Sequence, residues 1–368
     1  MKSKIILFMP HIGIGGVEKN FFLVSNFLAK NRKDIVVITI SKNSKKFLSK
    51  NINFVTLNFN FWQKLGKRLK YILALVLLLK EVFKYKSPLV ISFQANIYCG
   101  LLSKLFGFDL IIRSNTSPEG WSKNILKRII YKIGLKSAKA VLVNSIEFKK
   151  LIKKNFNVTA ECIYNPIDKK KIIGLSKKKI NFNFFEKNCL NIINVARLEK
   201  QKDQMTLLKA VNLIKNKIRF KLLIIGYGSM ENELKLYVNK NNLENNVKIL
   251  KNISNPFPYF IKSNLFILSS MFEGLPNVLL EALTLNKFVI STNCSTGPSE
   301  ILLNGKGGIL VPVSNHKNLA KQIIYYNKNK KKVKKKLMLA KKSLLRFDMN
   351  NYFKNFLKIV NKNLNLNQ

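Results

Sequence analysis

The sequence predicts an α/β protein made of two doubly wound domains, each built on a parallel sheet. The chain has 368 residues, which is long for one domain, and 47% of them are hydrophobic, which is enough for two buried cores. Short β-branched runs alternate with longer segments of helical periodicity along nearly the whole chain. This alternation indicates parallel strands joined by crossover helices.

Each half of the chain is expected to contribute six strands, in the order in which the β-branched runs occur. In the first half these runs span residues 5–9, 35–40, 54–57, 89–93, 110–113 and 140–143. In the second half they span residues 191–195, 220–225, 247–250, 265–268, 288–291 and 309–311. The segments of helical periodicity between them are predicted to be the crossover helices.

The first domain is predicted to span residues 1–168 and the second residues 189–345. Residues 169–188, a polar and lysine-rich stretch, are expected to form a basic linker between them. Residues 346–368 are amphipathic, with Tyr352, Phe356 and Val360 at helical spacing. We expect this tail to form a helix that returns to the first domain.

Cysteine usage and the length of the apolar runs indicate the cellular setting. The four cysteines, Cys99, Cys162, Cys189 and Cys294, include no C-x-x-C pair, which favours a reducing compartment over a disulfide or zinc framework. Five apolar residues precede Pro10, too few for a secretory signal. No run reaches the roughly 18 apolar residues that a bilayer span requires. A cytoplasmic protein is therefore expected.

The net charge of +48, from 66 basic and 18 acidic residues, predicts a polyanionic partner. Lysine outnumbers arginine, and basic residues are not interleaved with aromatic ones as on base-stacking surfaces. We therefore favour an anionic membrane surface and expect no nucleic acid. The apolar stretch 71–79 has a lysine at each end. It is either a helix in the membrane interface or a crossover helix packed on its sheet.

Two glutamates flank a Gly-Leu-Pro turn in the run Glu273-Gly-Leu-Pro-Asn-Val-Leu-Leu-Glu281. Pro276 fits the first position of a helix, whose free N–H groups and partial positive charge favour an anion such as phosphate. Glu273 then precedes the helix and Glu281 lies inside it. Their carboxylates can accept hydrogen bonds from sugar hydroxyls on either side of a bound diphosphate. The alternative is a capped surface helix with two solvated glutamates.

Three further polar loops follow predicted strands of the second half, where ligands bind in open parallel sheets. In chain order they contain Arg197 and Lys202, then Gly226 and Gly228, then Thr296-Gly-Pro-Ser-Glu300. An arginine and a lysine together suit a diphosphate, although these two are among 66 cations. Glycines at such a turn let a nucleotide approach the backbone closely.

In this order, the motifs resemble those of the retaining GT-B glycosyltransferases of family 4, the glycosyl transferases group 1. The resemblance covers nearly the whole chain. It is carried by Gly15-Gly16-Val-Glu18, Tyr164-Asn-Pro-Ile-Asp168, Arg197-Leu-Glu-Lys-Gln-Lys202, Gly226-Tyr-Gly228, the run from Glu273 to Glu281, Gly297-Pro-Ser-Glu-Ile301 and Gly308-Ile-Leu-Val-Pro312. It implies the GT-B architecture, in which two Rossmann-like domains face each other across a cleft.

The resemblance also implies an activity, the transfer of a sugar from a nucleotide diphosphate-sugar, most often a UDP-sugar, with retention of configuration. Catalysis then rests on charge stabilisation of the leaving diphosphate rather than on a protein nucleophile. No cofactor and no metal are expected, and the lack of an Asp-x-Asp motif agrees with metal-independent chemistry. A glycosidase mechanism with paired carboxylates fits poorly, since both glutamates are committed to binding.

The resemblance further implies roles for individual residues. Arg197 and Lys202 would neutralise the leaving diphosphate, and Glu273, the third residue of this catalytic group, would bind the hydroxyls of the donor sugar. Glu281 would bind the ribose. The other donor-binding positions would be Gly15, Gly16, Gly226, Gly228, Gly274, Leu275, Pro276 and Asn277. The first two would let a loop of the first domain approach the diphosphate.

The acceptor side is less defined, because many members of the family carry a first-domain histidine that is missing here from the loops after strands 89–93 and 110–113. The polar candidates are Arg113, Asn115 and Glu119, with His11 after the first strand as either a catalytic or a structural residue. The basic surface and the lack of a spanning segment favour a lipid-linked oligosaccharide or another cell-envelope glycan as acceptor. We expect a peripheral enzyme on the inner face of the cell membrane.

Three other functions are compared with this one. A dinucleotide-dependent oxidoreductase would need Gly-x-Gly-x-x-Gly after the first strand and an acidic residue after the second, where the chain has Gly13-Ile-Gly-Gly-Val-Glu18 and Ser41-Lys42. A basic nucleic-acid-binding protein accounts for the charge but not for the glutamates or the glycine turns. A GT-B epimerase of UDP-sugars would share the motifs and would lack room for an acceptor.

Overall fold

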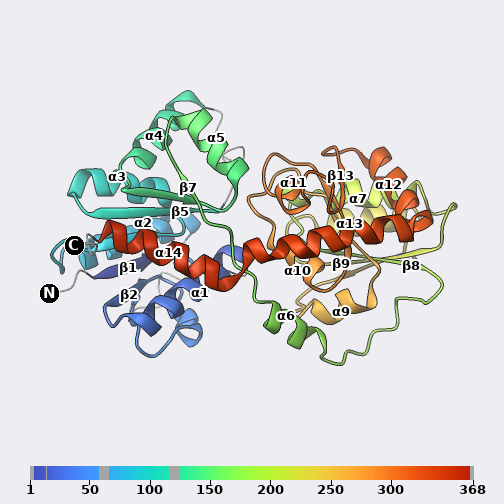
Figure 1. The fold of residues 1–368 in the computed structure, drawn as a ribbon, viewed down its shortest axis with the longest axis horizontal. Coiled ribbons are helices and arrows are strands. Elements are labelled where there is room, and N and C mark those ends of the chain that lie inside the picture. The colour runs from blue at the N-terminus through green and yellow to red at the C-terminus, as the bar shows by residue number, and fades with distance from the viewer. Residues whose placement is uncertain (1–3, 14, 58–65, 116–123, 365–368) are drawn as a thin grey trace. The chain divides into compact units, whose positions relative to one another are not determined.

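The computed structural model describes residues 4–13, 15–57, 66–115 and 124–364, and the chain divides into two compact units (Figure 1). Unit 1 consists of Met1–Pro166 and Met349–Gln368, and unit 2 of Ile167–Asp348. Each unit has its own parallel sheet and its own hydrophobic core. The predicted fold class of two doubly wound α/β domains is thereby confirmed.

Unit 1 contains a seven-stranded parallel sheet in the order β3-β2-β1-β4-β5-β6-β7. Its strands are β1 (Ile5–Phe8), β2 (Ile35–Ile38), β3 (Asn53–Val55), β4 (Leu89–Ser92), β5 (Asp109–Ser114), β6 (Ala140–Val143) and β7 (Glu161–Cys162). Its helices are α1 (Gly16–Asn31), α2 (Lys67–Val82), α3 (Asn96–Phe106), α4 (Ile125–Lys136), α5 (Ile146–Phe156) and α14 (Met349–Asn363), with the short 3-10 helix η1 (Lys42–Phe47). Strand β7 was not predicted, because it is too short to give a β-branched run.

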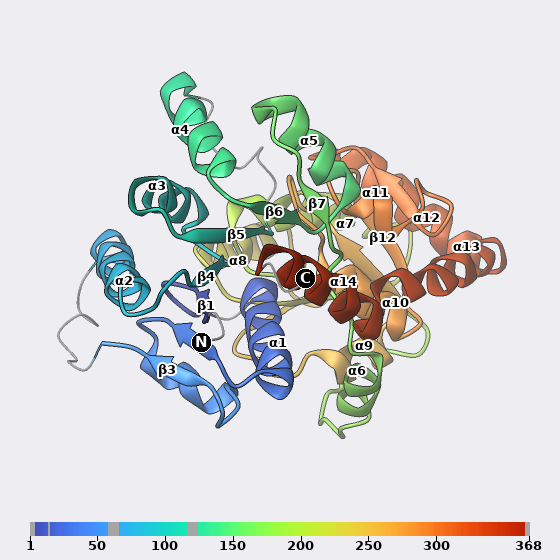
Figure 2. The same cartoon turned by 60° about the vertical axis from the view of Figure 1, so that its left-hand side comes forward.

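Two hydrophobic layers cover the faces of this sheet. One combines α1 with α14, which lie beside each other in Figure 2, and it buries Tyr352, Phe356 and Val360. The other combines α2, α3, α4 and α5, and it buries Ala74 and Leu78 of α2. Residues 71–79 therefore belong to a crossover helix packed on the sheet, the second of the two interpretations left open above.

Unit 2 contains a six-stranded parallel sheet in the order β10-β9-β8-β11-β12-β13. Its strands are β8 (Leu190–Val195), β9 (Phe220–Ile225), β10 (Val247–Leu250), β11 (Leu265–Leu268), β12 (Phe288–Thr292) and β13 (Ile309–Val311). Its helices are α6 (Lys169–Ser176), α7 (Gln204–Asn212), α8 (Glu231–Lys240), α9 (Phe257–Lys262), α10 (Asn277–Thr284), α11 (Pro298–Ile301), α12 (His316–Lys328) and α13 (Lys330–Ser343), with the 3-10 helices η4 (Lys200–Lys202) and η5 (Leu344–Phe347).

The stretch predicted as a linker, residues 169–188, is part of unit 2. It begins with α6, and this helix contacts α9 and α10. The lysine-rich composition hid the helix, because its buried side is limited to Ile172 and Ser176. Asp168 caps the helix by accepting the N–H of Lys171 at 2.9 Å.

All twelve predicted strands are present, with ends that differ by at most two residues from those expected. The strand order of unit 2 reverses between β8 and β11, which are neighbours with Leu265 opposite Ile192. In open parallel sheets, the crevice at the carboxyl ends of these two central strands is where ligands bind. Among the described residues, no helix is long and apolar enough to cross a membrane.

Candidate active site

The loop after β8 brings Arg197 and Lys202 to the carboxyl end of the unit 2 sheet. Asp203 holds this loop in place, because its carboxylate accepts the N–H of Thr206 at 3.2 Å and the Thr206 hydroxyl at 2.8 Å, which caps α7. Gln204 donates from Nε2 to the carbonyl of Arg197 at 2.9 Å. Arg197 is exposed, so its side chain is accessible to a ligand.

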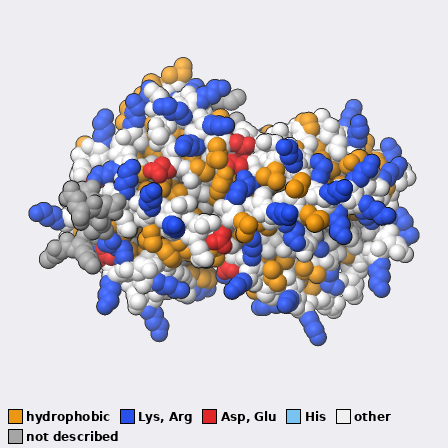
Figure 3. All heavy atoms as spheres, in the orientation of Figure 1, with side chains coloured by type: hydrophobic (Ala, Val, Ile, Leu, Met, Phe, Trp, Pro, Cys, Tyr) orange, Lys and Arg blue, Asp and Glu red, His pale blue; other side chains and the backbone are white. Residues whose placement is uncertain are grey.

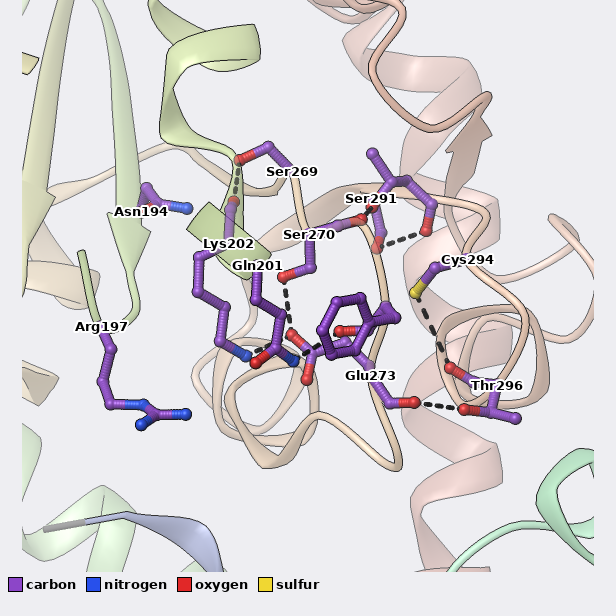
Figure 4. A network of polar contacts seen from close by, with 12 residues as sticks. Asn194, Arg197, Gln201, Lys202, Ser269, Ser270, Glu273, Ser291, Cys294 and Thr296 are labelled. Carbon is purple, nitrogen blue, oxygen red and sulfur yellow. Dashed lines mark hydrogen bonds and ion pairs between the residues drawn. The ribbon is translucent and has the colours of Figure 1, made fainter. Parts of the chain in front are cut away.

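The ammonium group of Lys202 points at the carboxylate of Glu273, which follows β11. Their Nζ and Oε1 atoms are 2.5 Å apart, and the Ser270 hydroxyl donates to the same oxygen at 2.6 Å (Figure 4). The side chains of Lys202 and Glu273 are 15% and 9% exposed. The structure therefore brings together two residues that the sequence assigned to the diphosphate and to the donor sugar.

Backbone contacts fix the loop after β8 against the loop after β11. The Gln201 side-chain amide donates to the carbonyl of Phe272 at 2.7 Å, and the backbone N–H of Met271 donates to the carbonyl of Gln201 at 2.8 Å. The Ser269 hydroxyl donates to the carbonyl of Lys202 at 2.9 Å. Three bonds of this kind hold the ion pair in one geometry, as a preorganised charge site requires.

The loop after β12 supports Glu273 from the other side. The Thr296 hydroxyl donates to the carbonyl of Glu273, and the Thr292 hydroxyl donates to the carbonyl of Ser270 at 2.6 Å. Gly297 has a φ of +89°, and a Cβ atom there would lie 2.2 Å from the carbonyl oxygen of Gly274. A glycine is therefore needed where this loop meets the turn of the glutamate motif.

Helix α10 begins one residue later than predicted. Pro276 has a ψ of 100°, which is an extended conformation, so it precedes the helix and Asn277 is its first residue. No side chain caps this end of the helix. Gly274, Leu275 and Pro276 are buried, while Asn277 and Glu281 are half-buried. The Gly-Leu-Pro segment and the first residue of α10 therefore follow Glu273 directly. Glu281 lies one helical turn after the start of α10.

Gly226 and Gly228 allow two segments of backbone to come close together. A Cβ atom on Gly226 would lie 1.9 Å from the carbonyl oxygen of Ala196, and one on Gly228 would lie 2.3 Å from that of Leu198. The two glycines follow β9 and pack on the loop that carries Arg197. This packing explains both glycines without a ligand, and their part in donor binding stays a prediction.

The comparison with known proteins identifies the family of the chain. The model of the family "Glycosyl transferases group 1" matches residues 176–342. Over 297 residues, the chain is 34% identical to an uncharacterized glycosyltransferase of Methanocaldococcus jannaschii, with 72% of each chain covered. The chain belongs to the group 1 glycosyltransferases. It is therefore a glycosyltransferase, and the family that the motifs resemble is confirmed.

Two further matches extend over the whole length of this glycosyltransferase. One is the GalNAc-alpha-(1->4)-GalNAc-alpha-(1->3)-diNAcBac-PP-undecaprenol alpha-1,4-N-acetyl-D-galactosaminyltransferase of Campylobacter jejuni, 25% identical over 369 residues, with 97% and 98% of the two chains covered. The other is the crystal structure of HepE from Anabaena in complex with UDP, which has a TM-score of 0.75 at 17% identity and covers 98% and 100% of the chains. The second match shows the GT-B fold.

In unit 1 of the glycosyltransferase, three candidate residues lie at or after the end of β1. His11 is exposed, and its Nδ1 atom is 3.1 Å from the hydroxyl of Ser41. Gly15 precedes α1, and Gly16 is its first residue. The acceptor candidate Glu119 lies outside the described residues.

Arg113 does not line an acceptor site in this structure, and that expectation is corrected. Its side chain is fully buried and donates to the carbonyls of Val143 and Ile163 at 3.1 and 2.7 Å and to Oδ1 of Asn165 at 3.0 Å. Burial lowers the pKa of its guanidinium. The ring of Tyr352 in α14 lies 6.0 Å away. Arg113 thus ties together the strands and the helix of unit 1, a structural role that a polar residue at a strand end does not reveal.

Asn115 and Asn144 directly follow β5 and β6. Both side-chain polar atoms of Asn115 and the Oδ1 atom of Asn144 are buried without a hydrogen-bond partner in the described part of the chain. Buried amides are rarely left unpaired, so these atoms are candidates for contact with a ligand or water. Asn115 therefore remains a candidate for the acceptor side, and Asn144 is added as a second candidate.

Two residues of the unit 2 site were missed from the sequence. Gln201 was quoted within its motif without a role, and Asn194 lies in a strand, where its amide donates to the carbonyl of Ile267 at 2.8 Å. Their contacts are to backbone carbonyls distant in sequence, and no local pattern signals such contacts. No group of three His, Cys, Asp or Glu side chains among the described residues is placed to hold a metal ion.

Proposed function

We propose that this glycosyltransferase transfers the sugar of a UDP-sugar to a lipid-linked oligosaccharide or another cell-envelope glycan, with retention of configuration. The observation that carries the proposal is the ion pair of Lys202 and Glu273 between the two central strands of unit 2. HepE, whose fold is similar, is described in complex with UDP. The Campylobacter relative is named for an acceptor linked to diphospho-undecaprenol.

The donor site is proposed to work by charge stabilisation. Lys202 and Arg197 bind the diphosphate, and the start of α10 adds its partial positive charge. Glu273 holds Lys202 in place and accepts hydrogen bonds from hydroxyls of the donor sugar. As the bond to the sugar breaks, negative charge grows on the diphosphate, and cations fixed beforehand stabilise that charge without having to rearrange.

The remaining donor contacts are proposed from the motif positions. Glu281 in α10 binds the ribose hydroxyls, and the turn from Gly274 to Asn277 faces the sugar and the phosphates. Gly226 and Gly228 shape the loop beneath the nucleotide. Gly15 and Gly16 let the loop after β1 in unit 1 approach the diphosphate. No metal ion is required in this scheme, because Arg197 and Lys202 supply the positive charge.

The acceptor side is proposed to lie in unit 1. The amides of Asn115 and Asn144 offer hydrogen-bond donors and acceptors to the hydroxyls of a glycan. The exposed imidazole of His11 lies at the end of β1, where it can contact a polar ligand. Transfer to a lipid-linked acceptor places the reaction at the inner face of the cell membrane.

Nucleotide binding tests the donor site. Titration calorimetry would compare UDP, GDP and ADP and their common sugars in EDTA, on the wild type and on an Arg197→Ala, Lys202→Ala variant. We expect UDP to bind the wild type without metal and the variant at least tenfold more weakly, since a hydrogen bond to a charged group contributes about 1.5–3 kcal/mol. Lys200→Ala is the matched control, because Lys200 is an exposed cation of the same short helix η4.

Turnover then tests the reaction. The best-binding UDP-sugar is incubated with undecaprenyl-diphosphate-linked saccharides, and the product is analysed by mass spectrometry and by NMR of the anomeric proton. An extended acceptor with the donor's configuration is the expected product. Equal nucleotide binding by the wild type and the double variant would show that Arg197 and Lys202 are wrongly assigned to the donor site. Conversion of the donor to another UDP-sugar without transfer would show that the protein acts as an epimerase rather than as a transferase.

A further inference from the structure

The sheet of unit 1 has its own reversal of strand order, between β1 and β4. These two strands are neighbours, with Ile5 opposite Leu89 and Phe8 opposite Ser92. The sheet continues from β1 to β2 and β3 on one side, and from β4 to β5, β6 and β7 on the other. Open parallel sheets bind ligands at the carboxyl ends of two such strands. The loops that follow β1 and β4 are therefore the expected position of a ligand in unit 1.

Glu18, in the first turn of α1, turns its carboxylate back over the loop that follows β1. A Cβ atom on Gly15 would lie 2.7 Å from the Oε2 atom of Glu18, and one on Gly13 would lie 3.6 Å from its Oε1 atom. Among the described residues, this half-buried carboxylate has neither a hydrogen bond nor an ion pair. The chain has 66 cations, and basic side chains far outnumber acidic ones on the face drawn in Figure 3. An unpaired carboxylate in such a protein is available to accept hydrogen bonds from a ligand.

Gln94 follows β4, and Tyr71 of α2 holds its side chain. The Tyr71 hydroxyl donates to the Oε1 atom of Gln94 at 3.2 Å. In the described part of the chain, the Nε2 atom of Gln94 has no acceptor, so the amide can donate to a ligand. Ala95, the next residue, has a φ of +55°, which is a strained conformation for a residue with a Cβ atom. Strained residues of this kind cluster at functional sites.

Two further elements bring side chains to the same place. Burial, and after it the charge of Glu18 and the nearby Tyr98, raises the pKa of the Tyr71 hydroxyl. Glu18 and Tyr98 are therefore close enough to Tyr71 to act on it electrostatically. Tyr98 lies in the first turn of α3 and is 56% exposed. A carboxylate, an amide and two tyrosines thus gather at the carboxyl ends of β1 and β4.

This combination of groups suits a neutral sugar ring. A carboxylate accepts hydrogen bonds from hydroxyl groups, and an amide both donates and accepts them. An aromatic ring covers the apolar face of a ligand, while a few polar groups fix the orientation of that ligand. A phosphate is disfavoured here, because the carboxylate of Glu18 would repel it. The site in unit 2 has the opposite character, with Arg197 and Lys202 placed to bind a diphosphate.

We propose that Glu18, Gln94 and Tyr98 bind the acceptor sugar that receives the transferred residue, and that Tyr71 is a positioning residue that holds Gln94. The inference rests on the proposed function, because it names the part of unit 1 that recognises the acceptor. Glu18 accepts hydrogen bonds from two adjacent hydroxyls, and the Gln94 amide donates to a further oxygen. The ring of Tyr98 packs on the C–H groups of the sugar. The ligand is thus a neutral sugar with two adjacent free hydroxyls.

Binding of simple sugars tests this subsite without requiring transfer. The full-length chain, with and without UDP, is titrated with the methyl glycosides of GlcNAc, GalNAc, glucose and galactose and followed by saturation-transfer NMR. We expect the wild type to bind at least one of them. Glu18→Ala and Tyr98→Ala should bind the same glycoside at least about tenfold more weakly. A glycoside that lacks one of the recognised hydroxyls should bind the wild type more weakly and Glu18→Ala no differently from the parent glycoside.

Initial rates give a second readout, with the lipid-linked saccharide that the wild type extends. The KM for this acceptor should rise at least about tenfold in Glu18→Ala and Tyr98→Ala, while the KM for the UDP-sugar stays within about twofold. Tyr71→Phe should raise the acceptor KM about threefold and should add nothing to Gln94→Ala in the double variant, because it acts only through Gln94. A merely structural role of Tyr71 would instead give additive losses.

Matched controls lie elsewhere in unit 1. Glu147 is a half-buried acidic residue in the first turn of α5, and Phe106 is a 41% exposed aromatic residue at the end of α3. Glu147→Ala and Phe106→Ala should keep both KM values within about twofold of the wild type. A melting curve of each variant reports its folding. Glu18→Gln, which keeps the size of the side chain, replaces Glu18→Ala where the alanine variant is unfolded.

Two results would overturn this proposal. Unchanged acceptor binding and KM in Glu18→Ala and Tyr98→Ala would exclude these residues from the acceptor site. A rise in the KM for the UDP-sugar in place of the acceptor KM would assign them to the donor. Failure of the proposed function is recognised separately, because a wild type that transfers no sugar leaves the glycoside titration as the deciding measurement. Binding of no glycoside would then contradict the subsite as well.

Discussion

The Nζ atom of Lys202 lies 2.5 Å from the Oε1 atom of Glu273, although 71 positions separate the two residues in the sequence. The pair joins the loop after β8 to the loop after β11. Both side chains are largely withdrawn from water, so the charges interact in a poorly screened environment. Removing one member alone leaves its partner as an uncompensated charge.

This relationship predicts that stability and activity respond differently in a double-mutant cycle. Glu273→Gln leaves the Lys202 ammonium without its counter-ion and should lower the free energy of unfolding by about 1–3 kcal/mol. Adding Lys202→Met removes the unpaired charge and should restore part of that loss. Transfer activity should stay at least 100-fold down in both variants, as for other fixed charge-stabilising groups.

Urea denaturation and initial-rate measurements on the four proteins of the cycle check this prediction. Ser270→Ala serves as a milder comparison, since it removes one hydrogen bond to Glu273 without a charge. Strictly additive losses of stability would show that the pair does not couple. An active double variant would show that neither residue takes part in catalysis.

A second prediction concerns Arg197, which is exposed and can be changed without disturbing the core. Arg197→Ala should leave the free energy of unfolding within about 0.5 kcal/mol of the wild type, as surface substitutions usually do. The dissociation constant for UDP should rise at least tenfold. Arg197→Lys should recover part of the affinity, because a lysine keeps the charge but not the bidentate geometry. Calorimetric binding with a parallel melting curve separates the two effects, and a large loss of stability would contradict the assignment.

The strands, and the end of the second sheet where the motif residues meet, could be predicted from the sequence because both depend on local signals. Every β-branched run became a strand, and the motif residues follow strands whose carboxyl ends meet in a parallel sheet. Lys202 and Glu273 could therefore be assigned to one site before their contact was known. The strand order, which brings β8 beside β11, cannot be predicted from local signals.

The features that were missed depend on burial and on contacts distant in sequence. Arg113 was expected to line a ligand site, yet it lies within β5, and two nitrogens of its buried guanidinium donate to the carbonyls of Val143 and Ile163. Gly226 and Gly228 pack on the backbone of the adjacent loop, a contact that the motif alone does not indicate, and their part in donor binding stays a prediction. Helix α6 was taken for linker because lysines dominate its composition. In each case the deciding partner lies elsewhere in the sequence.

A third prediction uses two glycines with opposite surroundings. Gly297→Ala should destabilise the protein and lower donor affinity, because its Cβ atom would meet the carbonyl of Gly274 at 2.2 Å and its φ of +89° strains an alanine. Gly174→Ala in α6 meets nothing within 4 Å and should stabilise the helix by about 0.5–1 kcal/mol. Thermal unfolding and UDP titration on both variants test this contrast, and equal effects would contradict it.

The last prediction concerns pH and Lys287, which precedes β12. Its ammonium group donates to the carbonyls of Ile261 and Ser263 at 3.0 and 2.8 Å, and burial lowers its pKa from 10.5 to about 8. Between these two values, the folded protein has lost this proton while the unfolded chain still binds it. Stability rises with pH wherever the unfolded state binds more protons. The wild type should therefore gain stability, relative to Lys287→Met, as the pH is raised from 7.5 to 10.

Urea denaturation at four or five pH values measures this difference directly. The comparison with Lys287→Met matters because a protein with a charge of +48 also gains stability from the general loss of repulsion at high pH. Lys262→Met changes an exposed lysine of the neighbouring helix α9 and should follow the wild type throughout. Parallel curves for wild type and Lys287→Met would mean that the two carbonyl acceptors compensate for burial and keep Lys287 charged in the folded protein.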